Sequence, residues 1–252
     1  MSKVYETGHA KNVANFETLI SFVASYGATY NPSRASIQLA ALQTKAAAAS
    51  TAMHQVNTLL ATNGNVIAAR ETTFEPLKKL STRLLNALKA TDVAKPVVDN
   101  LASLNRKIQG KRAGTATAKK EASTPNDPVV DPTNSPVKIS TSQQSFDSML
   151  DTFQKQVELL ASLPQYAPNE TELQVATLQN LYTKLKMQNA AVINSSTDIS
   201  NARLSRNETM YHAENGLVAT AADVKNYVKS VYGASSPQFK QISSLSFKAL
   251  PL

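Results

Sequence analysis

One motif occurs twice in this chain, and the repeat constrains the fold more than any other feature of the sequence. YNPSRASIQLAALQ begins at Tyr30, and YAPNETELQVATLQ begins 136 residues later, at Tyr166. Tyrosine, proline, glutamine, alanine and leucine recur in register between the two copies. Such a repeat indicates that one structural unit occurs twice along the chain.

Apolar residues follow each copy of the motif at alternating spacings of three and four. The first set is Leu39, Leu42, Ala46, Ala49, Met53, Val56 and Leu60, and the second is Val175, Leu178, Tyr182, Leu185 and Val192. This heptad spacing predicts a long helix with a coiled-coil seam in each copy, which the polar Asn189 interrupts in the second. We expect the helices to begin near Pro32 and Pro168, and the first to end before Asn63-Gly64.

Shorter matches on either side of these segments predict four helices in each copy. FVASY and KPVVDNLASL in the first copy correspond to LLASL and SPQFKQISSL in the second. A low glycine content and the absence of tryptophan also favour an all-α fold. We therefore expect two tandem-duplicated four-helix units, each an up-down helical bundle, over residues 1–109 and 141–252. A pseudo-twofold relation between them is expected, as in a fused homodimer, with two separate bundles in line as the alternative.

A basic and proline-rich segment at 110–140 is the predicted linker between the copies. Residues 106–140 carry half of the net charge of +8, and four prolines between 125 and 136 exclude a helix there. The candidate contacts for phosphate or other anionic groups are Arg106, Lys107, Lys111, Arg112, Lys119 and Lys120, with Lys78, Lys79 and Arg83 on the expected third helix. No aromatic residue is interleaved with the basic segment, so stacking on nucleic-acid bases is not predicted.

The sequence lacks the patterns of common catalytic and metal sites. It has no cysteine, which excludes disulfides, thiolate catalysis and cysteine-bound zinc. Its three histidines, His9, His54 and His212, are not spaced as helical metal ligands, and no glycine-rich loop precedes a helix. We expect a protein that is not an enzyme and has no catalytic residue, cofactor or metal.

Two glutamates fall at corresponding places in the copies, each close to an arginine. Glu71 lies beside Arg70, and Glu208 lies two residues after Arg206. The pair of carboxylates could perform acid–base chemistry if burial separated their pKa values. An arginine–glutamate pair that fixes the register of the helices is the favoured interpretation.

The N-terminal residues and the hydropathy of the chain predict a cytoplasmic protein. MSKVYETGHAKN contains no continuous apolar run of the kind found in secretory signals. No stretch approaches the roughly 18–20 apolar residues that span a bilayer.

Several longer words of the sequence resemble those of a family of uncharacterised bacterial proteins. These are NVANFETLISF, PLKKLSTRLLNALKATD, NRKIQGKR, ETELQVATLQNL, NARLSRN and VKNYVKSVYGASSPQFKQISSL. The likeness covers nearly the whole chain apart from the linker. It implies an all-α protein with two related halves, and it implies no activity, cofactor or site residue.

Three classes of function are compatible with these features. The first is a scaffold or interaction protein that docks helix on helix with a protein partner or with itself. The second is a nucleic-acid- or ribosome-associated protein that binds phosphates through the basic residues at 106–120. The third and least favoured is a membrane-active bundle, because the most apolar hairpin candidate, residues 46–61, is interrupted by polar side chains.

Overall fold

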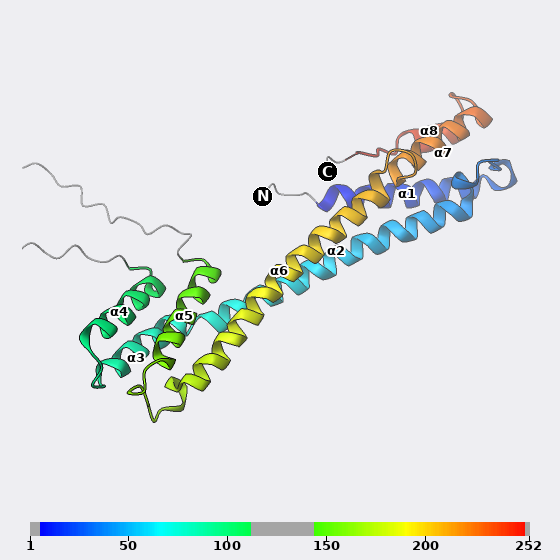
Figure 1. The fold of residues 1–252 in the computed structure, drawn as a ribbon. Helices are drawn as coiled ribbons and strands as arrows, with labels where there is room; N and C mark the ends of the chain where they lie inside the picture. Colours follow the sequence, from blue (N-terminus) through cyan, green and yellow to red (C-terminus); the bar gives the residue numbers. More distant parts are fainter. Residues whose placement is uncertain (1–5, 112–143, 250–252) are drawn as a thin grey trace, which may run out of the picture. The chain divides into compact units, whose positions relative to one another are not determined.

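The computed structural model describes residues 6–111 and 144–249, and it confirms the predicted all-α class. Regular secondary structure in these residues is helical, and they form no strand. The α-helices are α1 (Glu6–Ser25), α2 (Leu39–Phe74), α3 (Leu77–Lys89), α4 (Lys95–Gln109), α5 (Phe146–Ala161), α6 (Val175–Tyr211), α7 (Leu217–Tyr232) and α8 (Pro237–Ser243) (Figure 1). Short 3-10 turns, η2 (Ala35–Ile37) and η4 (Thr171–Leu173), precede α2 and α6.

The chain divides into two compact units, and each combines segments from both halves of the sequence. Among the described residues, unit 1 joins those up to Gly64 with those from Asn194 onward, and unit 2 is Asn65–Ile193. The compact units therefore do not follow the predicted copies at 1–109 and 141–252. The two four-helix copies remain a prediction from the sequence repeat. Of the predicted linker at 110–140, only Gly110 and Lys111 lie within the described residues.

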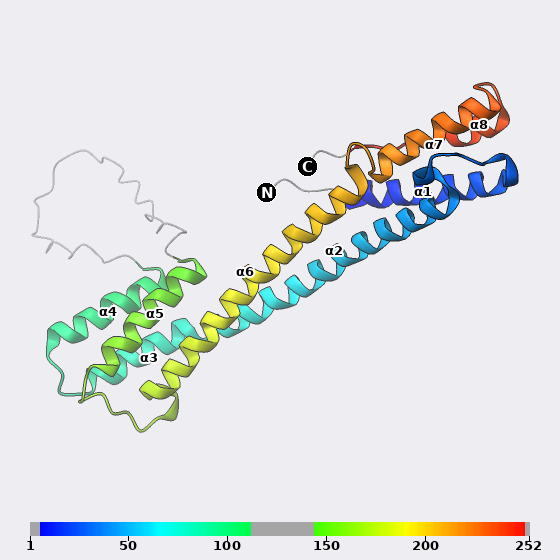
Figure 2. The same ribbon diagram turned by 45° about the vertical axis from the view of Figure 1, so that its right-hand side comes forward.

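Unit 1 is built around α1, which packs against α7 and α8. Both views place α7 and α8 side by side in this unit (Figures 1 and 2). Phe16 and Leu19 of α1 are fully buried in one apolar cluster with Val224 and Val228 of α7 and Ile242 of α8. The buried positions of α1 and α7 recur mostly every three or four residues, so one face of each of these helices points into the core.

Unit 2 is built around α4, which packs against both α3 and α5. Its apolar cluster contains Phe153 and Leu160 of α5, Leu84 and Leu88 of α3, and Leu101 of α4, all with no exposed surface. The outer side of α3 is polar, and its apolar residues fall on one face, as expected for a helix that covers a core on one side.

The chain turns into α2 and α6 through the same set of hydrogen bonds. The Tyr30 hydroxyl donates to the carbonyl oxygen of Ile37 at 2.6 Å, and the Tyr166 hydroxyl donates to that of Leu173 at 2.9 Å. The buried tyrosine holds its turn in extended and 3-10 conformations, so the α-helix starts only after it. The expected helix starts near Pro32 and Pro168 were therefore wrong by several residues.

The expected end of the first long helix near Asn63-Gly64 was also wrong. Helix α2 continues through Gly64 to Phe74, which is buried at 3% exposure, and Pro76 follows two residues later. A glycine inside a helix costs only about 1 kcal/mol relative to alanine. The apolar residues that continue on both sides of Gly64 are sufficient to maintain the helix. The residue before a proline disfavours helical geometry, which explains the actual end.

The ends of the shorter helices follow local capping signals. Pro96 and Pro237 occupy the first turns of α4 and α8, where a proline removes no intrahelical hydrogen bond. Gly233 ends α7 with a φ of 87°, a conformation that favours glycine.

Candidate functional site

The predicted seam residues lie on the inward sides of the two long helices. On α2, Leu42, Ala46, Ala49 and Val56 are buried, and Leu39, Met53 and Leu60 are half-buried. On α6, Leu178, Leu185 and Val192 are buried, as is the polar Asn189, and Val175 and Tyr182 are half-buried. These side chains support the core and do not form an open docking surface.

Large apolar side chains are instead exposed at a different set of positions. Among the described residues they are Met187 (67% exposed), Ile193 (56%) and Leu204 (62%) on α6, and Val231 (41%) on α7. None of them belongs to the predicted seams. Exposed apolar side chains on a helix are the groups that helix–helix docking would bury.

The structure brings together two of the predicted basic groups in unit 2. The Gln109 side chain at the end of α4 donates to the carbonyl oxygen of Lys78 at 2.6 Å and to the Thr82 hydroxyl at 3.1 Å. The last turn of α4, with Arg106 and Lys107, therefore lies against the first turns of α3. The exposed residues Lys78, Lys79, Arg106 and Lys107 are called the basic cluster below.

The other predicted basic residues have different positions. Arg83 forms an ion pair with Glu172 at 2.5 Å, so its charge is already balanced. Lys111 is exposed just after the end of α4. Arg112, Lys119 and Lys120 lie outside the described residues.

The three histidines make separate local contacts and do not form one site. His9 is buried, and its Nδ1 lies 2.7 Å from the Tyr211 hydroxyl. His54 is exposed on α2 near Thr58, and His212 accepts from the backbone N–H of Glu214 just after α6. Within 6–111 and 144–249 no group of three histidine, aspartate or glutamate side chains could hold a metal ion.

The two glutamates that correspond between the copies are both exposed. Glu208 lies 3.7 Å from Nε2 of His212, and Arg206 donates to the Asn207 side chain at 3.0 Å. Arg70 donates to Asn189 at 3.2 Å and stacks its guanidinium 3.9 Å from the Phe146 ring. Both carboxylates therefore face solvent, and the buried pair that acid–base chemistry would need is not formed.

A buried polar network crosses the core of unit 2, which sequence reasoning did not identify. The Gln156 amide donates to the Ser81 hydroxyl at 2.8 Å, and that hydroxyl donates to the Asn105 side chain at 2.8 Å. The three residues come from α5, α3 and α4. A buried amide needs such partners, because desolvating it without them costs about 1–3 kcal/mol.

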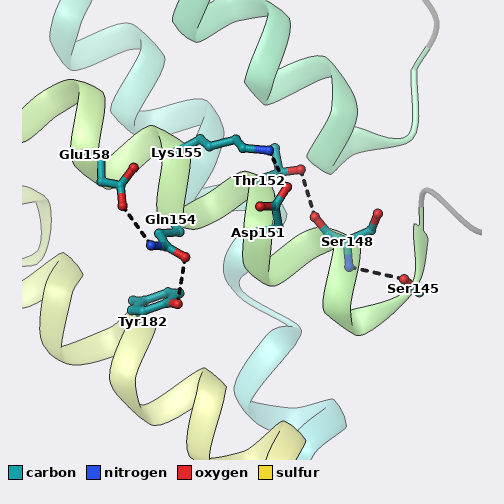
Figure 3. Close-up of polar contacts among 8 residues, drawn as sticks. All are labelled: Ser145, Ser148, Asp151, Thr152, Gln154, Lys155, Glu158 and Tyr182. Carbon is teal, nitrogen blue, oxygen red and sulfur yellow. Dashed lines mark hydrogen bonds and ion pairs between the residues drawn. The ribbon is translucent and has the colours of Figure 1, made fainter.

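The outer face of α5 carries polar contacts of a different kind (Figure 3). Lys155 pairs with Asp151 one turn earlier, and Gln154 donates to Glu158 at 2.7 Å. The hydroxyl of Tyr182, from α6, donates to Gln154 at 2.8 Å. Together with the Ser145 cap at the start of α5, these contacts stabilise one helix and its neighbour.

The main open cavities of the two units are shallow and have few charged groups. In unit 1, Lys45, Glu208 and Asn215 line a cavity of about 570 Å³. Burial lowers the pKa of Lys45, whose amino group donates to the Asn215 carbonyl oxygen. In unit 2, a cavity of about 490 Å³ lies between the end of α3 and the turn that holds Tyr166.

No protein-family model, curated protein or solved structure matches this chain. In the part of the chain that the structure describes, no helix has both the length and the hydrophobicity needed to cross a membrane. The features that remain for a function are the exposed apolar residues and the basic cluster.

Proposed function

We propose that the protein is a non-enzymatic cytoplasmic scaffold that docks helix on helix with a protein partner or with a second copy of itself. The observation that carries this proposal is the exposure of large apolar side chains on α6, namely Met187 and Ile193 in unit 2 and Leu204 in unit 1. Burying such side chains in a complex contributes up to roughly 1.5–3 kcal/mol each.

We also infer that the two halves of the chain are tandem duplicates with a pseudo-twofold relation. The matching tyrosine turns support this inference, as do the lengths of α2 and α6, 36 and 37 residues. Phe16 of α1 and Phe153 of α5 are both fully buried at corresponding places in the two halves.

Light scattering over a range of protein concentrations, at low and high salt, tests the scaffold function. We expect the molar mass to rise with concentration and to survive high salt, because apolar docking is not screened by ions. A triple variant, Met187→Gln, Ile193→Gln and Leu204→Gln, should lose this association, and Val231→Gln on α7 should retain it. A constant monomer mass in the natural chain would exclude self-association as the function. The variants would then be compared for binding to a partner protein.

A second candidate function is binding of phosphate backbones through the basic cluster. It is favoured by the hydrogen bond from Gln109 to Lys78, which holds four exposed positive side chains at one end of α3 and α4. Replacing Lys78 and Lys107 by glutamine should weaken RNA binding and reduce its salt dependence. The matched control replaces Lys89 and Lys95, which are exposed at the opposite ends of the same helices. Each lost phosphate contact should lower the slope of log K against log salt by about 0.9 for duplexes or 0.7 for single strands.

A further inference from the structure

Helices α3 and α7 align position by position, although they belong to different halves of the chain. Leu77, Ser81, Leu84 and Leu88 of α3 are buried, and so are Leu217, Ala221, Val224 and Val228 of α7, each 140 residues later. In this register Asn86 corresponds to Asn226 and Lys89 to Lys229. This alignment places Arg83 of α3 at the same position as Asp223 of α7.

These two aligned residues carry opposite charges, and each pairs with the turn of the other half. In unit 1, Arg34 beside η2 binds Asp223 of α7 at 2.7 Å. In unit 2, Glu172 of η4 binds Arg83 of α3 at 2.5 Å. The turns η2 and η4 are themselves corresponding elements, and Arg34 aligns with Glu170, two residues before Glu172. The turn is therefore positive where it meets Asp223 and negative where it meets Arg83.

The exchange of sign distinguishes two ways of pairing the halves. In the observed units, each turn meets the third helix of the other half, and both contacts are attractive. If each turn met the third helix of a second copy of its own half, Arg34 would approach Arg83 and Glu172 would approach Asp223. Both contacts would then be repulsive.

A buried polar residue also favours the pairing of each first helix with the third helix of the other half. Gln156 of α5 finds its hydrogen-bond partner in Ser81 of α3, which belongs to the other half. The residue of α1 that corresponds to Gln156 is Leu19, which is buried in one apolar cluster with Ala221 of α7. If each first helix packed on its own half, Gln156 would face Ala221 and lose its partner. Leu19 would face Ser81.

We propose that the two halves of the chain are heterospecific partners: the first helix and turn of each half recognise the third and fourth helices of the other half and reject their own. This inference rests on the proposed duplication for the register of α3 and α7. It assigns a function to the divergence of the copies, because identical copies could not favour a pair of unlike halves over a pair of like halves.

Cleavage of the folded chain tests this proposal. A protease site is inserted between residues 120 and 130, the folded protein is cut, and the mixture is denatured in urea and refolded. We expect native mass spectrometry to find a one-to-one complex of the two halves. Pairs of like halves, or two halves that are folded and separate, would overturn the proposal. If the uncut chain stays monomeric in light scattering while its cut halves form a one-to-one complex, that result would support this inference and exclude self-association from the proposed function.

Charge reversal at the turns tests whether these ion pairs select the pairing of the halves. Arg34→Glu together with Glu172→Arg keeps the net charge and makes both observed contacts repulsive. Since two weak attractions are replaced by two repulsions, we expect the cut halves to bind about tenfold more weakly. Adding Arg83→Asp and Asp223→Arg should restore the affinity of the natural halves. Equal affinity for the natural, two-site and four-site proteins would contradict a role of these charges.

Discussion

The hydroxyl of Tyr166 donates a hydrogen bond to the carbonyl oxygen of Leu173, seven residues later, across the turn that leads into α6. Tyr30 makes the same bond to Ile37 ahead of α2. Both tyrosines are buried, at 5% and 8% exposure, so neither carbonyl oxygen has easy access to water as a replacement.

Replacing either tyrosine by phenylalanine should therefore destabilise the protein. Tyr166→Phe leaves the Leu173 carbonyl oxygen without its donor, and we expect a loss of about 1–3 kcal/mol in the free energy of unfolding. Urea denaturation followed by circular dichroism measures this loss. Tyr182→Phe is the matched control, because the Tyr182 hydroxyl is bonded to Gln154 on the outer face of α5 and should matter less.

Stability at alkaline pH should depend on the same tyrosine. Burial, with a smaller contribution from Glu170, raises the pKa of Tyr166 from 10.0 to about 12. The folded state keeps this phenol neutral after the unfolded state has ionised, so its stabilising contribution is complete below pH 10 and is lost between pH 10 and 12. Urea denaturation from pH 9 to 12 should show a steeper decline for the natural protein than for Tyr166→Phe. Parallel curves would contradict the raised pKa.

Gly64→Ala should stabilise the protein. Gly64 lies in the interior of α2, and a Cβ built on it meets no atom within 4 Å. Alanine also restricts the unfolded chain, so we expect a gain of roughly 0.5–1 kcal/mol in the free energy of unfolding. The comparison is Gly233→Ala at the end of α7, where φ is 87° and the same change should destabilise. Thermal denaturation of both variants measures the two signs.

Asn12→Leu should release the segment that follows α8. The Asn12 side chain donates to the Lys248 carbonyl oxygen at 2.8 Å and accepts from the Lys248 N–H at 3.1 Å. Without this pair of bonds, hydrogen exchange of the Lys248 amide should accelerate by at least tenfold, measured by NMR. Asn15→Leu is the control, because Asn15 contacts only the Ser246 carbonyl oxygen, near the surface. Unchanged exchange at Lys248 in the Asn12 variant would show that other contacts hold the segment.

An exchange of side chains between α1 and α5 should have unequal effects. Leu19→Gln places an amide in the apolar core of unit 1, and we expect a loss of about 2–5 kcal/mol in the free energy of unfolding. Gln156→Leu removes an amide whose Oε1 has no hydrogen-bond partner among the described residues, and Ser81 keeps its bond to Asn105. Gln156→Leu should lower the free energy of unfolding by less than about 1 kcal/mol. Equal losses in urea denaturation would contradict this difference between the cores.

The class of the fold and the inward faces of the helices could be predicted because they depend on periodicity. Leu42, Leu178 and Leu185 occupy the predicted heptad seams, and they are fully buried. Local capping signals were equally informative at Pro96 and Gly233. The start of α2 was not predictable in this way, because it depends on the Tyr30 hydroxyl reaching a carbonyl seven residues away.

The pairing of the halves could not be predicted from periodicity. Corresponding helices present the same apolar pattern. The apolar pattern alone therefore does not show which half a helix packs against. The difference lies in single polar positions such as Arg83 and Asp223, which become informative only after the two helices are aligned. The same limit applies to the basic cluster, since only the contact between Gln109 and Lys78 shows that the two groups of positive charges are neighbours.

The interleaved composition of unit 1 has a consequence for the order in which the protein is synthesised. All residues of unit 2, Asn65–Ile193, leave the ribosome before α7, so this unit can fold during translation. Phe16 and Leu19 of α1 are made first, yet their partner helix α7 begins only at Leu217. At 5–20 residues per second, the apolar face of α1 waits roughly 10–40 s for that partner. The nascent chain is therefore most exposed to aggregation and to chaperone binding at its oldest helix.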